Sequence, residues 1–175
     1  MTILRFVSLC IIHSVFFKEK SLLKKILIGL GIIIVAIQFI PVDRSNPPVT
    51  QEINAPSNVL SILKTSCYDC HSNETKWPWY SYVAPVSFLI SADVENGRKR
   101  VNFSEWDKYD EKKKEKKMGA MIEAIEEGAM PLPKYLITHS EAKMNPEKIK
   151  LLKDWVTSDN GQDNGLRYEK EKKKD

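Results

Sequence analysis

Apolar residues are concentrated at the start of the chain and then recur with helical spacing. Two long apolar runs, residues 3–17 and 26–40, come first. Beyond them, the apolar positions and the capping signals predict helices over residues 57–66, from 85 to about 96, from 104 to about 128 and from 145 to about 158. The last of these places an apolar stripe on one face, formed by Ile149, Leu152, Trp155 and Val156. We therefore expect an all-α fold.

The second apolar run predicts a membrane-spanning helix. It contains no charged residue and one polar residue, Gln38. At 1.5 Å per residue, residues 26–40 span roughly 22 Å, which is short of a hydrocarbon core of roughly 30 Å. Counting from Leu22 makes the helix long enough, because Lys24 and Lys25 can extend toward the headgroups.

The charges around this run predict its orientation. Four lysines precede it, namely Lys18, Lys20, Lys24 and Lys25. The positive-inside rule then places the chain beyond Pro41 outside the cytoplasm. No small-residue cleavage site follows the run, so residues 21–41 are interpreted as an uncleaved, single-pass signal anchor in a bacterial inner membrane, with the following domain in the periplasm.

The remaining segments complete the predicted organisation. Residues 1–20 are either an over-extended start of the reading frame, which we favour, or an extra apolar segment. Residues 42–56 form a proline-rich, extended linker, and residues 159–175 form a charged, disordered tail. This leaves about 100 residues, 57–158, for one domain, whose small core a covalently held apolar cofactor would enlarge.

A short motif carries the strongest chemical signal. Cys67 and Cys70 are followed by His71, the Cys-x-x-Cys-His pattern of haem attachment. Two thiols at this spacing reach both vinyl groups on one porphyrin edge, and the next imidazole lies beneath the iron. We expect one covalent haem c, with His71 as the proximal ligand. A backbone carbonyl should hold the second ring nitrogen of His71, and residues 83–85 are at a plausible separation.

Other uses of the two cysteines stay open. A thioredoxin-like redox pair needs a nearby βαβ pattern, whereas a capped helix precedes this motif. A structural zinc site needs four ligands, and His13 and His139 are the remaining histidines, His13 being in an apolar run. A disulfide between the cysteines is possible outside the cytoplasm. We favour haem attachment, because covalent haem of this type is attached on the non-cytoplasmic side of a bacterial membrane. The predicted anchor places the domain on that side.

A second axial ligand is usually methionine or histidine. The candidates beyond the motif are Met118, Met121, Met130, Met144 and His139. Met118 and Met121 lie in a helical apolar stripe, and Met144 precedes a helix start, so these three are interpreted as packing residues. Met130 lies in a loop that contains glycine and that the prolines on either side of Leu132 stiffen, so a thioether is presented there at low entropic cost. We expect Met130 as the sixth ligand, with His139 or an open position as the alternatives.

These residues together resemble a known family. The motif after a helix, the Met130-Pro131 loop and the closing helix with Trp155 are similar to a small class I cytochrome c. More closely, the chain resembles the bacterial haem-binding domain proteins, which have a short membrane anchor. The similar segments are 43–48, 67–75, 77–80, 130–131 and 139–155. The resemblance implies haem binding and a first helix that crosses the last, with Trp155 packed on Val59 and Leu63.

Two functional hypotheses follow. The first is one-electron transfer at the outer face of the membrane, with a redox partner protein there. The second is a haem peroxidase or a gas or redox sensor with an open sixth position, in which His139 acts as a distal acid or base. The lysine run at residues 112–117 is interpreted as a solvated helix face, or alternatively as a docking patch for an acidic partner or an anionic membrane. Its interleaved acids argue against nucleic-acid binding.

Overall fold

A computed structural model describes residues 21–158 of the chain. The predicted N-terminal extension, residues 1–20, and the predicted tail, residues 159–175, lie outside the described residues. Within residues 21–158 the regular structure is helical, apart from one isolated β-bridge between Gln51 and Glu105. The all-α prediction is confirmed.

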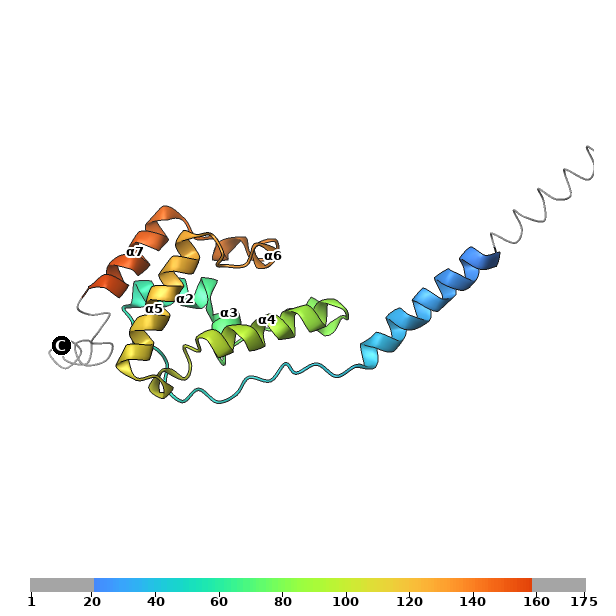
Figure 1. Ribbon diagram of the computed structural model, residues 1–175, viewed down its shortest axis with the longest axis horizontal. Coiled ribbons are helices and arrows are strands. Elements are labelled where there is room, and N and C mark those ends of the chain that lie inside the picture. The colour runs from blue at the N-terminus through green and yellow to red at the C-terminus, as the bar shows by residue number, and fades with distance from the viewer. Residues whose placement is uncertain (1–20, 159–175) are drawn as a thin grey trace, which may run out of the picture.

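The helices follow one another along the chain, with a long extended segment between the N-terminal helix and α2 and shorter connections elsewhere (Figure 1). They are the N-terminal helix Ser21–Phe39, whose last turn is the 3-10 helix η1 (Ile37–Phe39), then α2 (Ser57–Ser66), α3 (Tyr68–His71), η2 (Trp79–Tyr82), α4 (Val86–Arg100), η3 (Trp106–Lys108), α5 (Glu111–Glu126), α6 (Pro133–Leu136), η4 (Ser140–Ala142) and α7 (Pro146–Thr157).

The N-terminal helix projects from the helical domain (Figure 1). It has a mean hydropathy of 2.2 in its most apolar window, and none of that window is buried. The helix is long enough and apolar enough to cross a membrane, a property that membrane anchors and signal sequences share.

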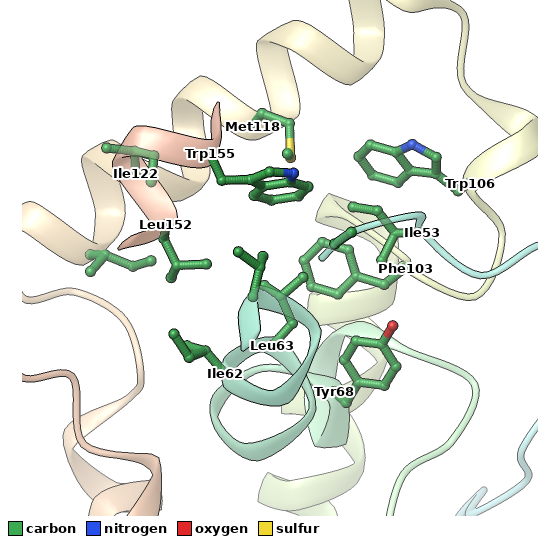
Figure 2. Close-up of a cluster of buried hydrophobic side chains, with 13 residues drawn as sticks. Ile53, Ile62, Leu63, Tyr68, Phe103, Trp106, Met118, Ile122, Leu152 and Trp155 are labelled. Carbon is green, nitrogen blue, oxygen red and sulfur yellow. The ribbon is translucent and has the colours of Figure 1, made fainter. Parts of the chain in front are cut away.

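Packing of three helices forms the core of the domain. Figure 2 shows Trp155 of α7 and Met118 of α5 facing one another above Leu63 of α2. Phe103 and Trp106, from the segment between α4 and α5, close the same cluster, with their ring centroids 6.1 Å apart. As expected, α2 and α7 are in contact, and Trp155 joins Leu63 in one buried cluster.

The predicted start of the long helix at Ser104 is wrong. Ser104 is fully buried, and its carbonyl accepts hydrogen bonds from Thr50 and Gln51 while its hydroxyl accepts one from Asn73. The helix begins instead at α5, where the side chain of Asp110 accepts a hydrogen bond from the backbone N–H of Lys113. The Ser104 hydroxyl and carbonyl, which an N-cap would use to bind the first turn of a helix, are therefore already engaged by residues distant in the sequence.

The extended segment between the N-terminal helix and α2 is packed on the domain. It runs alongside α4 (Figure 1), and Ile53 near its end is 2% exposed, within the core cluster. Arg98 of α4 donates hydrogen bonds to the Ser45 carbonyl and to the Asn46 side chain, at 3.0 and 2.8 Å. The same guanidinium donates to the Ser72 carbonyl at 2.8 Å and so ties the segment to the cysteine motif.

Candidate functional site

The Cys-x-x-Cys-His motif occupies a single helical turn. The N–H of Cys67 closes α2 by donating to the Leu63 carbonyl at 2.8 Å, and the backbone then bends at Cys67. In α3 the N–H groups of Cys70 and His71 both donate to the Cys67 carbonyl, at 3.2 and 2.9 Å. Both cysteines and the histidine are thus held on one short turn at the end of α2.

Helix α4 lies directly against this turn. A Cβ atom added to Gly97 would lie 2.3 Å from the Cys70 carbonyl oxygen, which is closer than real Cβ contacts. Only a residue without a side chain lets α4 approach the motif this closely. The close approach brings the carbonyl groups at the end of α4 to the His71 ring.

The His71 ring is oriented by two of those carbonyls. Its Nδ1 lies 2.9 Å from the Gly97 oxygen and 3.2 Å from the Val101 oxygen, so Nδ1–H donates and Nε2 is left for a metal. The prediction that residues 83–85 hold this ring is wrong, because the end of α4 rather than its start packs on the motif. Burial lowers the pKa of His71 and favours the neutral imidazole that a metal ligand requires.

The two thiols are kept protonated by their surroundings. Burial raises the pKa of Cys67 to about 12 and that of Cys70 to about 11, the latter with help from the carboxylates of Asp69 and Asp93. The two cysteines are not joined by a disulfide. A redox-active or nucleophilic cysteine needs the opposite environment, one that lowers its pKa. Neither thiol therefore has the lowered pKa that activates the cysteine of a thioredoxin-type oxidoreductase.

A cavity of about 470 Å³ opens beside the motif. Cys67, His71 and Met130 all line it, and most of its other lining side chains are apolar. The buried hydroxyl of Ser66 also lies on this lining, with no hydrogen-bond partner among the described residues. The structure thus brings the predicted sixth ligand and the predicted proximal ligand to the same cavity.

Two methionines that the sequence pattern assigned to packing also reach this cavity. Met121 on α5 and Met144 before α7 both line it, whereas Met118 is 3% exposed in the core cluster. The helical stripe around Met118 and Met121 spreads over more than one face of α5, so spacing alone did not separate a core methionine from a cavity methionine.

His139 lies in a different place. It lines a second cavity of about 300 Å³, together with Cys70 and Tyr135. Its ring stacks on Tyr135 at 4.0 Å between centroids, and its Nδ1 lies 3.2 Å from the Tyr135 carbonyl. The Tyr135 hydroxyl in turn donates to Asp69 at 2.7 Å. The structure brings Cys70 and His139 to this second cavity, while His71 and Met130 line the first.

A group of cations forms part of the first cavity's lining. Arg100 lies at the end of α4, and Lys113, Lys116 and Lys117 lie along α5. Lys117 lies 4.5 Å from the centre of the Tyr109 ring and donates to the Arg100 carbonyl. Burial and the nearby charges of Lys113 and Lys116 lower the pKa of Lys117. The lysine run is largely exposed, and three of its lysines also line this cavity.

Comparison with known proteins identifies the family. The sequence profile of the haem-binding domain family matches residues 32–158. The chain belongs to the haem-binding domain family. No curated protein and no solved structure matches the chain.

The residues around the first cavity, which Cys67, His71 and Met130 line, fit a haem. The apolar lining suits the porphyrin ring, the free Nε2 of His71 suits the iron, and the cations suit the two carboxylates that every haem carries. A zinc centre fits less well. Within residues 21–158 no group of three or more histidine, cysteine, aspartate and glutamate side chains is placed to hold a metal ion, and a structural zinc site needs four ligands.

Proposed function

We propose that this protein carries one covalent haem c and transfers single electrons at the outer face of the inner membrane. In this proposal Cys67 and Cys70 form the thioethers, His71 is the proximal ligand and Met130 is the sixth ligand. The observation that carries the proposal is the single cavity shared by Cys67, His71 and Met130, with Cys70 on the same helical turn as His71.

The loop that carries Met130 favours this residue over the other methionines. At the end of α5 the N–H groups of Ala129 and Met130 both donate to the Ala124 carbonyl, at 2.9 and 3.0 Å. Gly128 makes this turn with a φ of 69°, a left-handed conformation that suits glycine. The turn ends α5 next to the cavity, so Met130 lies in the loop after the helix whereas Met121 is fixed within α5.

Each surrounding group has a role in this proposal. A bound haem supplies an iron that gains and loses one electron. The Gly97 and Val101 carbonyls fix the tautomer and orientation of His71. The apolar lining limits the access of water, and a methionine ligand raises the reduction potential relative to a second histidine. Arg100, Lys116 and Lys117 balance the charge of the haem carboxylates.

The membrane and a redox partner complete the proposal. The apolar helix Ser21–Phe39 supports a membrane anchor, and the lysines before it support a periplasmic domain. An anchored carrier works at a raised local concentration near a membrane-bound redox protein, which is the partner class we propose.

Covalent attachment is tested by the pyridine haemochrome spectrum after acid–acetone extraction. We expect the purified full-length chain to retain one haem c, because a thioether-linked haem resists extraction. The variants Cys67→Ala and Cys70→Ala should each show the spectrum of a haem with one unreacted vinyl group. Complete loss of haem from the wild-type chain on extraction would overturn covalent attachment.

The sixth ligand is tested by a series of single variants. We expect Met130→Ala to abolish the near-infrared sulfur-to-iron charge-transfer band of the oxidised protein, because the thioether is lost. Met121→Ala and Met144→Ala are matched controls, since both residues line the same cavity. His139→Ala is the control for the alternative ligand and should leave the band unchanged. Persistence of the band in Met130→Ala would contradict the assignment.

Carbon monoxide separates an electron carrier from a haem enzyme or gas sensor. A methionine-ligated iron leaves no open position, so we expect the reduced wild-type protein to bind carbon monoxide slowly and incompletely at neutral pH. The Met130→Ala variant should bind it rapidly. Rapid and complete binding by the wild-type protein would favour the sensor or peroxidase class.

A further inference from the structure

The exposed apolar side chains of the domain are confined to one region. Within residues 41–158, every large apolar side chain that the structure exposes lies in residues 79–89 or at Ile137, apart from Val49. Trp79 is 78% exposed and Ile137 is 82% exposed. We call this region the apolar face. It consists of Trp79, Tyr82, Val83, Val86, Leu89 and Ile137.

Three members of the apolar face line one cavity, and the other three lie in η2 or directly after it. Val86, Leu89 and Ile137 line the same cavity of about 300 Å³, although they come from α4 and from the turn after α6. The Tyr80 and Thr138 hydroxyls are hydrogen-bonded at 2.9 Å and join η2 to that turn. Exposed single apolar residues are common on soluble domains, but a grouped patch marks a site of interaction.

The apolar face lies next to the end of the N-terminal helix. The Gln38 side chain in its last turn accepts a hydrogen bond from the Ala84 N–H at 3.0 Å and donates one to the Ala84 carbonyl at 3.1 Å. Figure 1 shows the start of α4 at the end of the domain nearest the blue N-terminal helix, with α6 facing the same way. Phe39, at the end of that helix, is itself 82% exposed.

The segment after the helix reinforces this placement. The Arg44 guanidinium lies 4.5 Å from the centre of the Tyr82 ring and donates to the Ser81 carbonyl at 3.3 Å. The Ser91 hydroxyl donates to the Asp43 carbonyl at 2.8 Å. These contacts hold the domain against the exit of the helix, so the apolar face stays at the level where the helix leaves the hydrocarbon.

We propose that the apolar face rests on the outer surface of the lipid bilayer, with Trp79 and Tyr82 at the headgroup level. This inference rests on the membrane-spanning helix of the proposed function. Tryptophan and tyrosine favour the bilayer interface because their rings are apolar at one end and polar at the other. The six side chains of the face carry no formal charge, and the face is continuous with a helix whose own surface suits hydrocarbon.

This docking sets the height of the electron-transfer site. Helix α4 begins at Val86, on the apolar face, and ends at Arg100, which lines the first cavity with His71 and Met130. Fifteen helical residues extend over roughly 21 Å between the first and the last Cα atoms. The cationic part of the cavity therefore lies away from the bilayer, where a partner protein can reach it.

The test uses the full-length haem-loaded chain in vesicles of phosphatidylethanolamine and phosphatidylglycerol. A photo-crosslinking residue is introduced as Trp79→p-benzoylphenylalanine or Ile137→p-benzoylphenylalanine. Both positions are more than three-quarters exposed, so the change does not disturb the core. The matched control is Lys150→p-benzoylphenylalanine on α7, where the side chain is 76% exposed and far from the N-terminal helix.

We expect phospholipid adducts at positions 79 and 137 at least tenfold above those at position 150, as measured by mass spectrometry. Equal yields at the three positions, or adducts at 79 and 137 to a second copy of the chain, would overturn the docking. Alkaline carbonate extraction of the same vesicles tests the span separately. Release of the chain would contradict the membrane anchor, whereas retention with no lipid adducts would contradict only the apolar face.

Discussion

At the scale of single residues, the close approach at Gly97 decides the geometry of the site. Its missing side chain lets α4 contact the Cys70 carbonyl, and its own carbonyl accepts from His71 at 2.9 Å. One residue therefore sets both the position of the motif and the tautomer of the proposed ligand. Gly119 on α5 differs, because a Cβ there would meet no atom within 4 Å.

A pair of alanine variants tests this role. We expect Gly97→Ala to reduce covalent haem content several-fold, because the added methyl group pushes α4 away from the motif. Gly119→Ala should keep full haem content and raise the free energy of unfolding by about 0.5–1 kcal/mol, the usual gain of alanine over glycine in a helix. Haem content is measured per polypeptide by pyridine haemochrome. Wild-type haem content in Gly97→Ala would show that the contact is dispensable.

At the scale of secondary structure elements, the start of α5 depends on a carboxylate cap. The Asp110 side chain accepts from the Lys113 N–H at 2.8 Å, and this bond lowers the pKa of the carboxyl below its ordinary value of 3.8. A lowered pKa in the folded state means that the charged cap stabilises the helix above pH 3.8 and loses this effect as the pH falls further.

The variant Asp110→Asn separates the charge from the cap, because asparagine caps a helix about as well as aspartate. We expect the difference in free energy of unfolding between wild type and variant to be constant near neutral pH. As the pH falls below about 4, the wild type should lose stability relative to the variant, because its aspartate becomes protonated. Urea unfolding followed by circular dichroism measures this difference. A difference that stays constant down to about pH 3 would contradict the assigned cap.

At the scale of the whole molecule, Arg98 connects three parts that are far apart in the sequence. It donates to the carbonyls of Ser45 and Ser72 and to the side chains of Asn46 and Thr75, all within 3.0 Å. The segment after the N-terminal helix, the residues next to the cysteine motif and α4 therefore meet at one guanidinium. The position of the domain relative to the N-terminal helix depends on this junction.

We expect Arg98→Ala to increase the rate of limited proteolysis within residues 41–52 by about tenfold or more, since hydrogen bonds to a charged group contribute about 1.5–3 kcal/mol each. Lys99→Ala is the matched control, because Lys99 lies on the exposed surface of the same helix and, within residues 21–158, forms an ion pair with Glu95 alone. Mass spectrometry of the cut sites gives the rates. Equal cleavage in both variants would show that other contacts hold the segment.

The sequence by itself determined the features that depend on neighbouring residues. The apolar helix, the all-α class and helix α2 follow from local patterns of side chains. The Cys-x-x-Cys-His spacing of Cys67, Cys70 and His71 is likewise read directly from the sequence, whereas the helical turn that they occupy was not predicted. These features were predictable because their physical causes lie within a few residues along the chain.

Only the tertiary structure decided the features that join distant residues. The carbonyl that orients His71 comes from Gly97, 26 residues later, and the contacts that displaced the start of α5 come from residues 50 and 51. Packing also placed Met130 on the lining of the same cavity as His71, and it placed His139 on the lining of the second cavity. No local pattern encodes these outcomes, because they depend on how α4 and α5 pack around the motif.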